Sequence, residues 1–147
     1  MSLLEQVYRQ VIMERSRKPR HRGTAEPTTH EKEGVNPSCG DELTLTLNVA
    51  DGVIREARFT GSGCAISLAS ADLMADAVTG LPVEEALSLG ETFRNFIRGE
   101  DPAVDLGELQ ALEGIRQLHA RVKCATLAWL TLEAALKDHP RGAHPTS

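Results

Sequence analysis

The spacing of hydrophobic residues changes twice along this chain, and these changes limit the folds that it can adopt. Between residues 43 and 49, leucine and valine alternate with polar residues, the pattern of a strand with one buried face. Asp51 and Gly52 then form a hairpin turn signal, and residues 53–60 return as a second strand, in which Ile54 breaks the alternation. Residues 31–36 are expected to add a short edge strand. The middle of the chain therefore predicts an antiparallel sheet of about three strands.

Helical spacing marks the segments on both sides of this predicted sheet. Residues 2–17 are expected to form a helix that begins at Ser2, where Glu5 completes a capping box. Further helices are predicted over 64–80, 82–99 and about 106–113. The last helix has an apolar stripe at Val122, Ala125, Trp129, Leu132 and Leu136. This order predicts an α+β fold with the helices packed on one face of the sheet.

The length and composition favour a single soluble domain. A chain of 147 residues is long enough to bury one core without disulfides, so residues 1–138 are expected to form the domain and 139–147 a disordered tail. A net charge of −5 gives no reason to expect a nucleic acid partner. The N-terminus lacks a secretory pattern, and no apolar run approaches the length of a membrane span. With an odd number of cysteines and no signal, a reducing cytoplasm is the expected location.

Three cysteines and one aspartate are the candidate functional residues. Cys39 and Asp41 flank Gly40 in N-P-S-C-G-D, so their side chains face the same side of an extended segment. Cys64 lies where G-S-G meets the start of a helix, and the backbone N–H groups there favour a thiolate. Cys124 lies in the first two turns of the last helix, one position off the apolar stripe, and is expected at the rim of the core.

Together these residues offer three sulfurs and a carboxylate, the number of ligands in a four-coordinate metal site. The set suits Zn²⁺, and thiolates also suit iron–sulfur clusters. Such a zinc site would be anionic, and Arg121 and Lys123 lie beside Cys124 and could offset its charge. Spacing alone leaves simpler interpretations open, because a lone cysteine can be a small core residue and Asp41 a turn residue.

The motifs together resemble the IscU-like family of iron–sulfur cluster biogenesis proteins, and most closely its SufU branch. N-P-x-C-G-D at 36–41, G-x-G-C-A-I-S at 61–67 and R-x-x-C-A-x-L-x-W at 121–129 are similar to family motifs, and R-K-P-R-H-R-G resembles the family's K-N-P-R-x-x-G loop. The likeness covers about residues 2–137. The scaffold branch is similar but has a histidine beside the third cysteine and an L-P-P-V-K motif, which this chain lacks. A long gap between the second and third cysteines, with an insertion over much of 82–112, also favours SufU.

This resemblance implies a zinc-dependent sulfur-transfer protein with the small α+β fold described above. Proteins of the SufU branch accept persulfide sulfur from a SufS-type cysteine desulfurase, and other iron–sulfur assembly proteins are further expected partners. By motif, Cys39 matches the sulfur acceptor, while Cys39, Asp41, Cys64 and Cys124 match the zinc ligands. Arg121 and Lys123 are expected to contact the partner or to support the site.

Two other functions and one unassigned feature remain open at this stage. The same four residues could hold a [2Fe–2S] cluster on an assembly scaffold, or zinc could brace a domain that only binds partners. The unassigned feature is a basic run that is expected to be a solvated helix end and loop, or else a docking surface. It comprises Arg15, Arg17, Lys18, Arg20 and Arg22.

Overall fold

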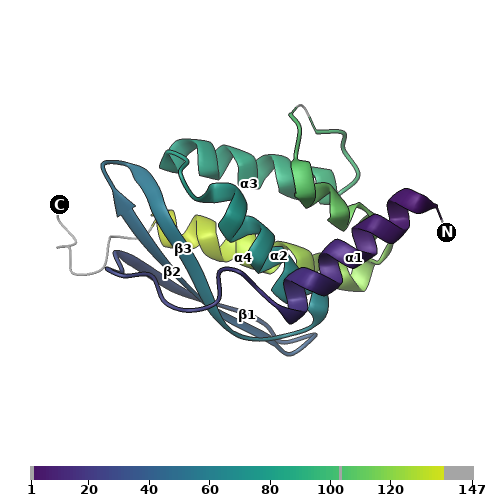
Figure 1. The fold of residues 1–147 in the computed structure, drawn as a ribbon, viewed down its shortest axis with the longest axis horizontal. Helices are drawn as coiled ribbons and strands as arrows, with labels where there is room; N and C mark the ends of the chain where they lie inside the picture. The colour runs from purple at the N-terminus through teal and green to yellow at the C-terminus, as the bar shows by residue number, and fades with distance from the viewer. Residues whose placement is uncertain (1, 103, 138–147) are drawn as a thin grey trace.

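The computed structural model describes residues 2–102 and 104–137, and it has the predicted α+β architecture (Figure 1). The predicted tail at 139–147 lies outside the described residues. No helix in the described ranges is long and apolar enough to cross a membrane. In chain order the elements are α1 (Leu3–Arg17), β1 (His30–Asn36), β2 (Asp41–Ala50), β3 (Val53–Ser62), α2 (Ala65–Val78), α3 (Val83–Ile97), the 3-10 helix η1 (Gly107–Gln117) and α4 (His119–Lys137).

The three strands form one antiparallel sheet in the order β1-β2-β3, as the sequence predicted. The alternating leucines of β2 are buried, and α2 and α4 pack against the sheet. The pairing of β2 with β3 shifts between Asn48 and Val49, so that Val49 lies opposite Ile54. This irregularity accounts for the broken alternation at Ile54, whose side chain is completely buried.

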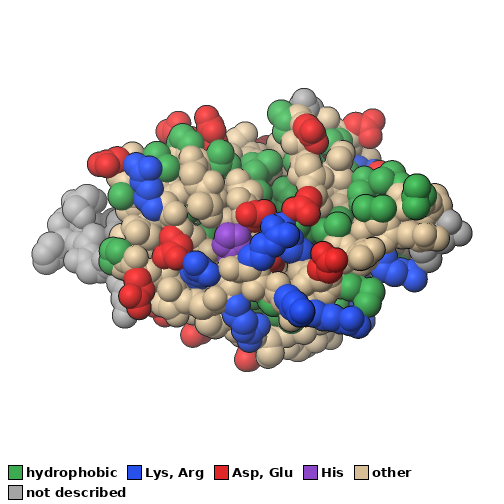
Figure 2. Space-filling model, in the orientation of Figure 1, with side chains coloured by type: hydrophobic (Ala, Val, Ile, Leu, Met, Phe, Trp, Pro, Cys, Tyr) green, Lys and Arg blue, Asp and Glu red, His purple; other side chains and the backbone are tan. Residues whose placement is uncertain are grey.

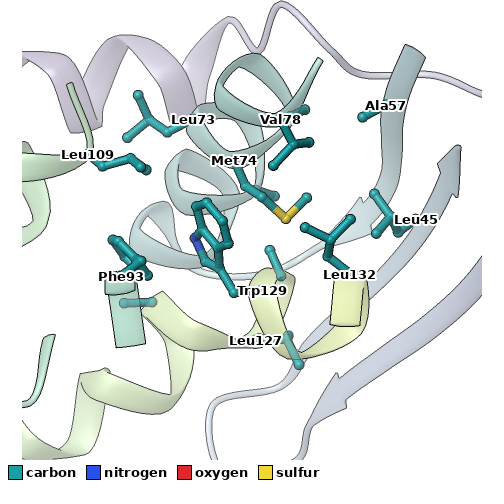
Figure 3. Close-up of a cluster of buried hydrophobic side chains, with 14 of the residues drawn as sticks. Leu45, Ala57, Leu73, Met74, Val78, Phe93, Leu109, Leu127, Trp129 and Leu132 are labelled. Carbon is teal, nitrogen blue, oxygen red and sulfur yellow. The ribbon is translucent and has the colours of Figure 1, made fainter. Parts of the chain in front are cut away.

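The core beneath the sheet is built around Trp129 of α4. Its ring stacks on Phe93 of α3 with the centroids 5.0 Å apart, and Met74 of α2 lies in the same cluster (Figure 3). Gly90 allows α3 to approach closely, because a Cβ at this position would lie 3.3 Å from the indole. The glycine that weakens α3 as an isolated helix therefore serves its packing against α4.

The predicted helices are confirmed, with one change of type. Ser2 caps α1, and its hydroxyl oxygen accepts the Glu5 N–H at 3.1 Å. The short helix predicted over about 106–113 is a 3-10 helix that continues to Gln117. The segment that the resemblance assigned to an insertion thus contains α3 and the first part of η1, which pack on α4.

Arg15 departs from the expectation that the whole basic run is solvated. Its side chain is only 3% exposed, and its guanidinium donates to Asp72 at 2.9 Å, to Asp76 at 3.0 Å and to Glu108. These carboxylates belong to α2 and η1, so Arg15 fastens α1 to both elements. Burial alone would raise the pKa of Asp76, but hydrogen bonds from Arg15 and His21 outweigh it and hold that pKa below its usual value.

We expect the substitution Gly34→Ala to destabilise the contact between β1 and α4. A Cβ at Gly34 would overlap the Thr131 hydroxyl, so the helix must move away from the strand. Overpacking of this kind costs about 1–3 kcal/mol in the free energy of unfolding, measurable by denaturant titration. Adding Thr131→Ala should recover part of the loss, after allowance for the effect of Thr131→Ala alone. Gly114→Ala is the control, since nothing lies within 4 Å of its added Cβ, and equal stability of both alanine variants would contradict the packing argument.

Candidate metal centre

The candidate residues meet where the β1–β2 turn approaches the first residues of α2 and α4. Cys39 lies in the turn, and its N–H donates to the Asn36 carbonyl at 3.3 Å. Gly40 follows with a φ of 72°, a left-handed conformation that places Asp41 at the start of β2. Cys39 and Asp41 therefore come to the same site through a turn, and not through the extended segment on which the prediction rested.

Asp41 is completely buried, and both of its carboxylate oxygens accept hydrogen bonds. The backbone N–H of Cys64 donates to Oδ1 at 2.9 Å, and the side-chain amide of Asn36 donates to Oδ2 at 3.2 Å. Asp41 is thus more than a turn residue, because it connects the two strands of the turn to the start of α2. The neighbouring Gly63 permits this approach, since a Cβ there would lie 2.7 Å from Oδ1.

Cys124 is the buried cysteine of the site. Its side chain is completely buried but is not part of the hydrophobic cluster around Trp129, which agrees with a position at the edge of the core and not at its centre. The position one step off the apolar stripe of α4 is covered by the sheet, and the Asn36 amide donates to the Cys124 sulfur at 3.7 Å. Burial, followed by hydrogen bonds with Cys39, Asp41 and Cys64, raises the pKa of the Cys124 thiol above its usual value.

Three of the four predicted ligand atoms already lie close together. One ligand atom each from Cys39, Asp41 and Cys124 lies within 4.8 Å of the other two. Donors on one zinc ion are at most about 4.6 Å apart, twice a bond of about 2.3 Å. Cys64 is not in this group of three, but its side chain contacts Cys124. Binding of one metal ion by all four residues would therefore require the Cys64 sulfur to join this group.

Cys64 occupies the N-cap position of α2, as its place in the sequence predicted. Its sulfur accepts the N–H of Ser67 at 3.4 Å, which satisfies one of the donors at the start of the helix. The positive end of the α2 dipole therefore lies beside the Cys64 sulfur.

Arg121 lies on the exposed rim of the site, one turn before Cys124. A side-chain hydrogen bond with Cys124, followed by electrostatic interactions with Cys64, Cys39 and Cys124, raises the pKa of this guanidinium above its usual value. Lys123 is also exposed in the same part of α4. The predicted cationic rim is therefore represented by Arg121, whose interactions with the three cysteines give it a direct relation to the site.

The donor chemistry of these residues fits a thiophilic metal. Thiolates with a single carboxylate suit Zn²⁺ or an iron–sulfur cluster and do not suit Mg²⁺ or Ca²⁺, which prefer oxygen ligands. The partly exposed Cys39 sulfur lies in the β1–β2 turn and makes a weak contact of 3.9 Å with the Ala120 carbonyl.

Asn36 and Gly63 were not assigned roles by the sequence reasoning. Asn36 connects Asp41 to Cys124 through its amide, and Gly63 leaves the space that Asp41 occupies. Both lie inside the motifs already noted. The sequence signals for their roles were an amide side chain at the start of the N-P-S-C-G-D turn and a glycine directly before Cys64. Their function depends on contacts between segments far apart in the sequence.

The fold and site together define a small α+β domain that gathers three cysteines and an aspartate at one end of its sheet. The chain belongs to the family described as the NifU-like N-terminal domain, whose model matches residues 7–144. This match confirms the IscU-like resemblance.

Known relatives are similar in sequence to this chain over nearly its whole length. The zinc-dependent sulfurtransferase SufU of Bacillus subtilis is 38% identical, with 95% of each chain covered. The iron–sulfur cluster assembly scaffold protein IscU of Thermotoga maritima is 43% identical and covers 95% of this chain and 99% of its own. Among solved structures, a protein from Fervidobacterium islandicum AW-1 that is named both SufU and an iron–sulfur cluster assembly scaffold protein for the SUF system has a TM-score of 0.84 and 34% identity, with 90% of this chain and 98% of that chain covered. The SufU branch is supported, and the names of the relatives include both a sulfurtransferase and a scaffold.

We expect Gly63→Ala to displace Asp41 from the Cys64 N–H. The added Cβ would lie 2.7 Å from the carboxylate oxygen, too close for either group to remain in place. The free energy of unfolding should fall by about 1–3 kcal/mol, and the buried Cys124 thiol of metal-free protein should be alkylated faster. Site-resolved mass spectrometry after brief alkylation measures the second effect. Ser62→Ala alters an exposed neighbour and is the control. Unchanged stability and unchanged Cys124 alkylation would show that Gly63 is not required for the close approach.

Proposed function

We propose that this protein accepts persulfide sulfur on Cys39 from a SufS-type cysteine desulfurase and passes it on during iron–sulfur cluster assembly. The observation that supports this most directly is the contrast between a partly exposed Cys39 in a turn and a fully buried Cys124 beside it. The family membership and the sulfurtransferase among the relatives support the same function.

Cys39, Asp41, Cys64 and Cys124 are the proposed ligands of one Zn²⁺ ion. When bound, the ion keeps the thiolates deprotonated. Asn36 and the Cys64 N–H hold the Asp41 carboxylate in place, which supports its proposed role as a ligand. These neutral donors orient the carboxylate without cancelling its charge, as partners of metal-binding carboxylates commonly do.

The proposed transfer follows the chemistry of thiol–disulfide exchange. The Cys39 thiolate attacks the outer sulfur of the partner's persulfide, a new S–S bond forms at Cys39, and the partner's S–S bond breaks. The partner cysteine leaves as a thiolate, so the outer sulfur moves and no external oxidant or reductant is consumed. Arg121 and Lys123 are proposed to stabilise the negative charge at the rim during the encounter.

A second candidate is a scaffold on which a [2Fe–2S] cluster is assembled on the same four residues and passed on. The relative from Thermotoga maritima named as a scaffold favours it. Metal analysis of protein purified without added iron separates the two functions: zinc supports the sulfur-transfer protein, whereas co-purifying iron and sulfide support the scaffold. Other iron–sulfur assembly proteins are proposed downstream partners in either case.

Asp41→Ala should reduce zinc affinity more than Asn36→Ala does. The first substitution removes a proposed ligand, whereas the second removes only the amide that orients it and contacts Cys124. Loss of an orienting partner typically weakens metal binding by about 10–100-fold, so a larger loss is expected for Asp41→Ala. Competition with a chromophoric chelator measures both affinities. Zinc affinity equal to wild type in the Asp41 variant would restrict this residue to a structural role.

Cys39→Ser should abolish sulfur acceptance and stimulation of the desulfurase. Serine lacks the nucleophilic sulfur, and no other thiol in the described structure combines comparable exposure with a place in a turn. Wild-type and Cys39→Ser protein are each incubated with the desulfurase and cysteine. Both are then analysed by mass spectrometry before any reductant is added. One added sulfur atom is expected on Cys39 of the wild-type protein and none on the variant. Its appearance on Cys124 instead would favour the scaffold, and its absence from all three cysteines would remove the proposed transfer.

Arg121→Ala should weaken activation of the desulfurase while leaving the fold intact. The side chain is fully exposed and interacts with the sulfurs of the site, so its loss removes positive charge from the rim without opening the core. Activation is measured over a range of salt concentrations, with Lys123→Ala testing the other half of the predicted rim. Arg98→Ala, at the exposed end of α3, is the control. Activation by the Arg121 variant that matches wild type at every salt concentration would contradict this role.

A further inference from the structure

Positive charge is concentrated in one short stretch of an otherwise acidic chain. Residues 9–22 contain six of the 16 Lys and Arg residues and only one of the 21 Asp and Glu residues. The rest of the chain therefore has ten basic and 20 acidic residues. The net charge of −5 therefore combines a basic segment with an acidic remainder of the chain.

Five of these six basic side chains are exposed and form what we call the basic strip: Arg9, Arg17, Lys18, Arg20 and Arg22. The sixth, Arg15, is excluded because it is buried among three carboxylates. Figure 2 shows Lys and Arg side chains gathered over α1 and the chain that follows it. An open hollow of about 910 Å³ runs along the strip and is lined by four of its five members. Glu14 is the only acidic side chain among its lining residues.

The basic strip leads to the candidate metal centre. Arg22 donates to the carbonyl of Gly61 at 2.8 Å, and Gly61 precedes Cys64 by three residues. A backbone carbonyl carries no net charge, so this bond fixes the guanidinium beside the site without neutralising it. Arg121 supplies positive charge at the α4 side of the same site. Positive charge therefore lies at the end of β3, the strand that leads to Cys64, and at the start of α4.

We infer that the basic strip docks an acidic surface of the desulfurase that supplies the persulfide. This inference rests on the proposed function, because a protein donor must cover Cys39 to transfer sulfur to it. A standard interface buries about 800 Å² on each partner, enough to extend from the site to the adjoining strip. Four of the five strip residues are arginines, whose planar guanidinium groups pair with carboxylates in a defined geometry.

Charge segregation also determines the orientation in which the two proteins meet. An acidic partner is repelled by most of this chain's surface and attracted by the strip. Complementary charge of this kind raises the association rate and suppresses wrong orientations, and both effects weaken as salt is added. The strip is thus expected to affect binding of the desulfurase and not the chemistry at Cys39.

The test compares two double charge reversals that change the net charge equally. Arg17→Glu/Arg20→Glu alters the strip, whereas Arg55→Glu/Arg98→Glu alters exposed residues of β3 and the end of α3. Each variant is titrated into the SufS-type desulfurase of the same organism, and the half-saturating concentration for stimulation is measured at several salt concentrations. The strip variant should need about tenfold more protein at low salt and show a weaker salt dependence. At saturation its rate and its Cys39 persulfide should equal wild type, and the control variant should behave as wild type throughout.

The outcomes separate this inference from the proposed function. Wild-type protein that acquires no persulfide from the desulfurase would remove the proposed function and the inference with it. Normal persulfide on wild type, with equal half-saturation of the strip and control variants, would overturn only the inference. Unchanged half-saturation together with a loss of RNA binding, or of a salt-dependent homodimer, in the strip variant would overturn it in favour of a nucleic acid or a second copy of this chain.

Discussion

A single buried carboxylate holds the parts of the candidate site together. Asp41 is withdrawn from water, and such a group is tolerated only where hydrogen bonds or a cation replace its hydration. Its oxygens receive the Asn36 amide from β1 and the Cys64 N–H from the start of α2. The arrangement of the turn, the sheet and α2 therefore depends on one side chain at the beginning of β2, and Gly63 is required because Asp41 occupies the space beside it.

The surroundings of the cysteines separate their chemical roles. Cys124 is enclosed by α4 and the sheet, where burial raises the pKa of its thiol and keeps a partner away from its sulfur. Cys64 caps a helix, so moving it would expose the first N–H groups of α2. Cys39 has neither constraint, because it lies in a turn with a weak sulfur contact. Of the three, only Cys39 combines access to a partner with freedom to move, and this follows from local structure independently of the family.

Most of the fold could be predicted because hydrophobic spacing determines which face of each element is buried. Alternating hydrophobic residues predicted β2 and β3, and helical spacing predicted α1 to α4. The shift in strand pairing between Asn48 and Val49 could not be predicted without knowing which residues pair. One error shows the limit of this reasoning. Arg15 was assigned to a solvated run, yet it is buried against α2 and η1, which are distant in sequence. Hydrophobic spacing shows how a segment faces its own core, and it does not show which other segments cover it.

The same long-range construction determines how a metal would relate to folding. The proposed ligands come from a turn, a strand and the starts of two helices, so they meet only after the sheet and α4 have packed. Asp41 is already oriented by Asn36 and Cys64, and the core around Trp129 does not involve the site. Small zinc domains with closely spaced cysteines depend on the metal to fold. Here the domain supplies the geometry first, and bound metal would chiefly fix the β1–β2 turn to α2 and α4. A site of this kind can release the Cys39 turn to a partner while the rest of the fold remains intact.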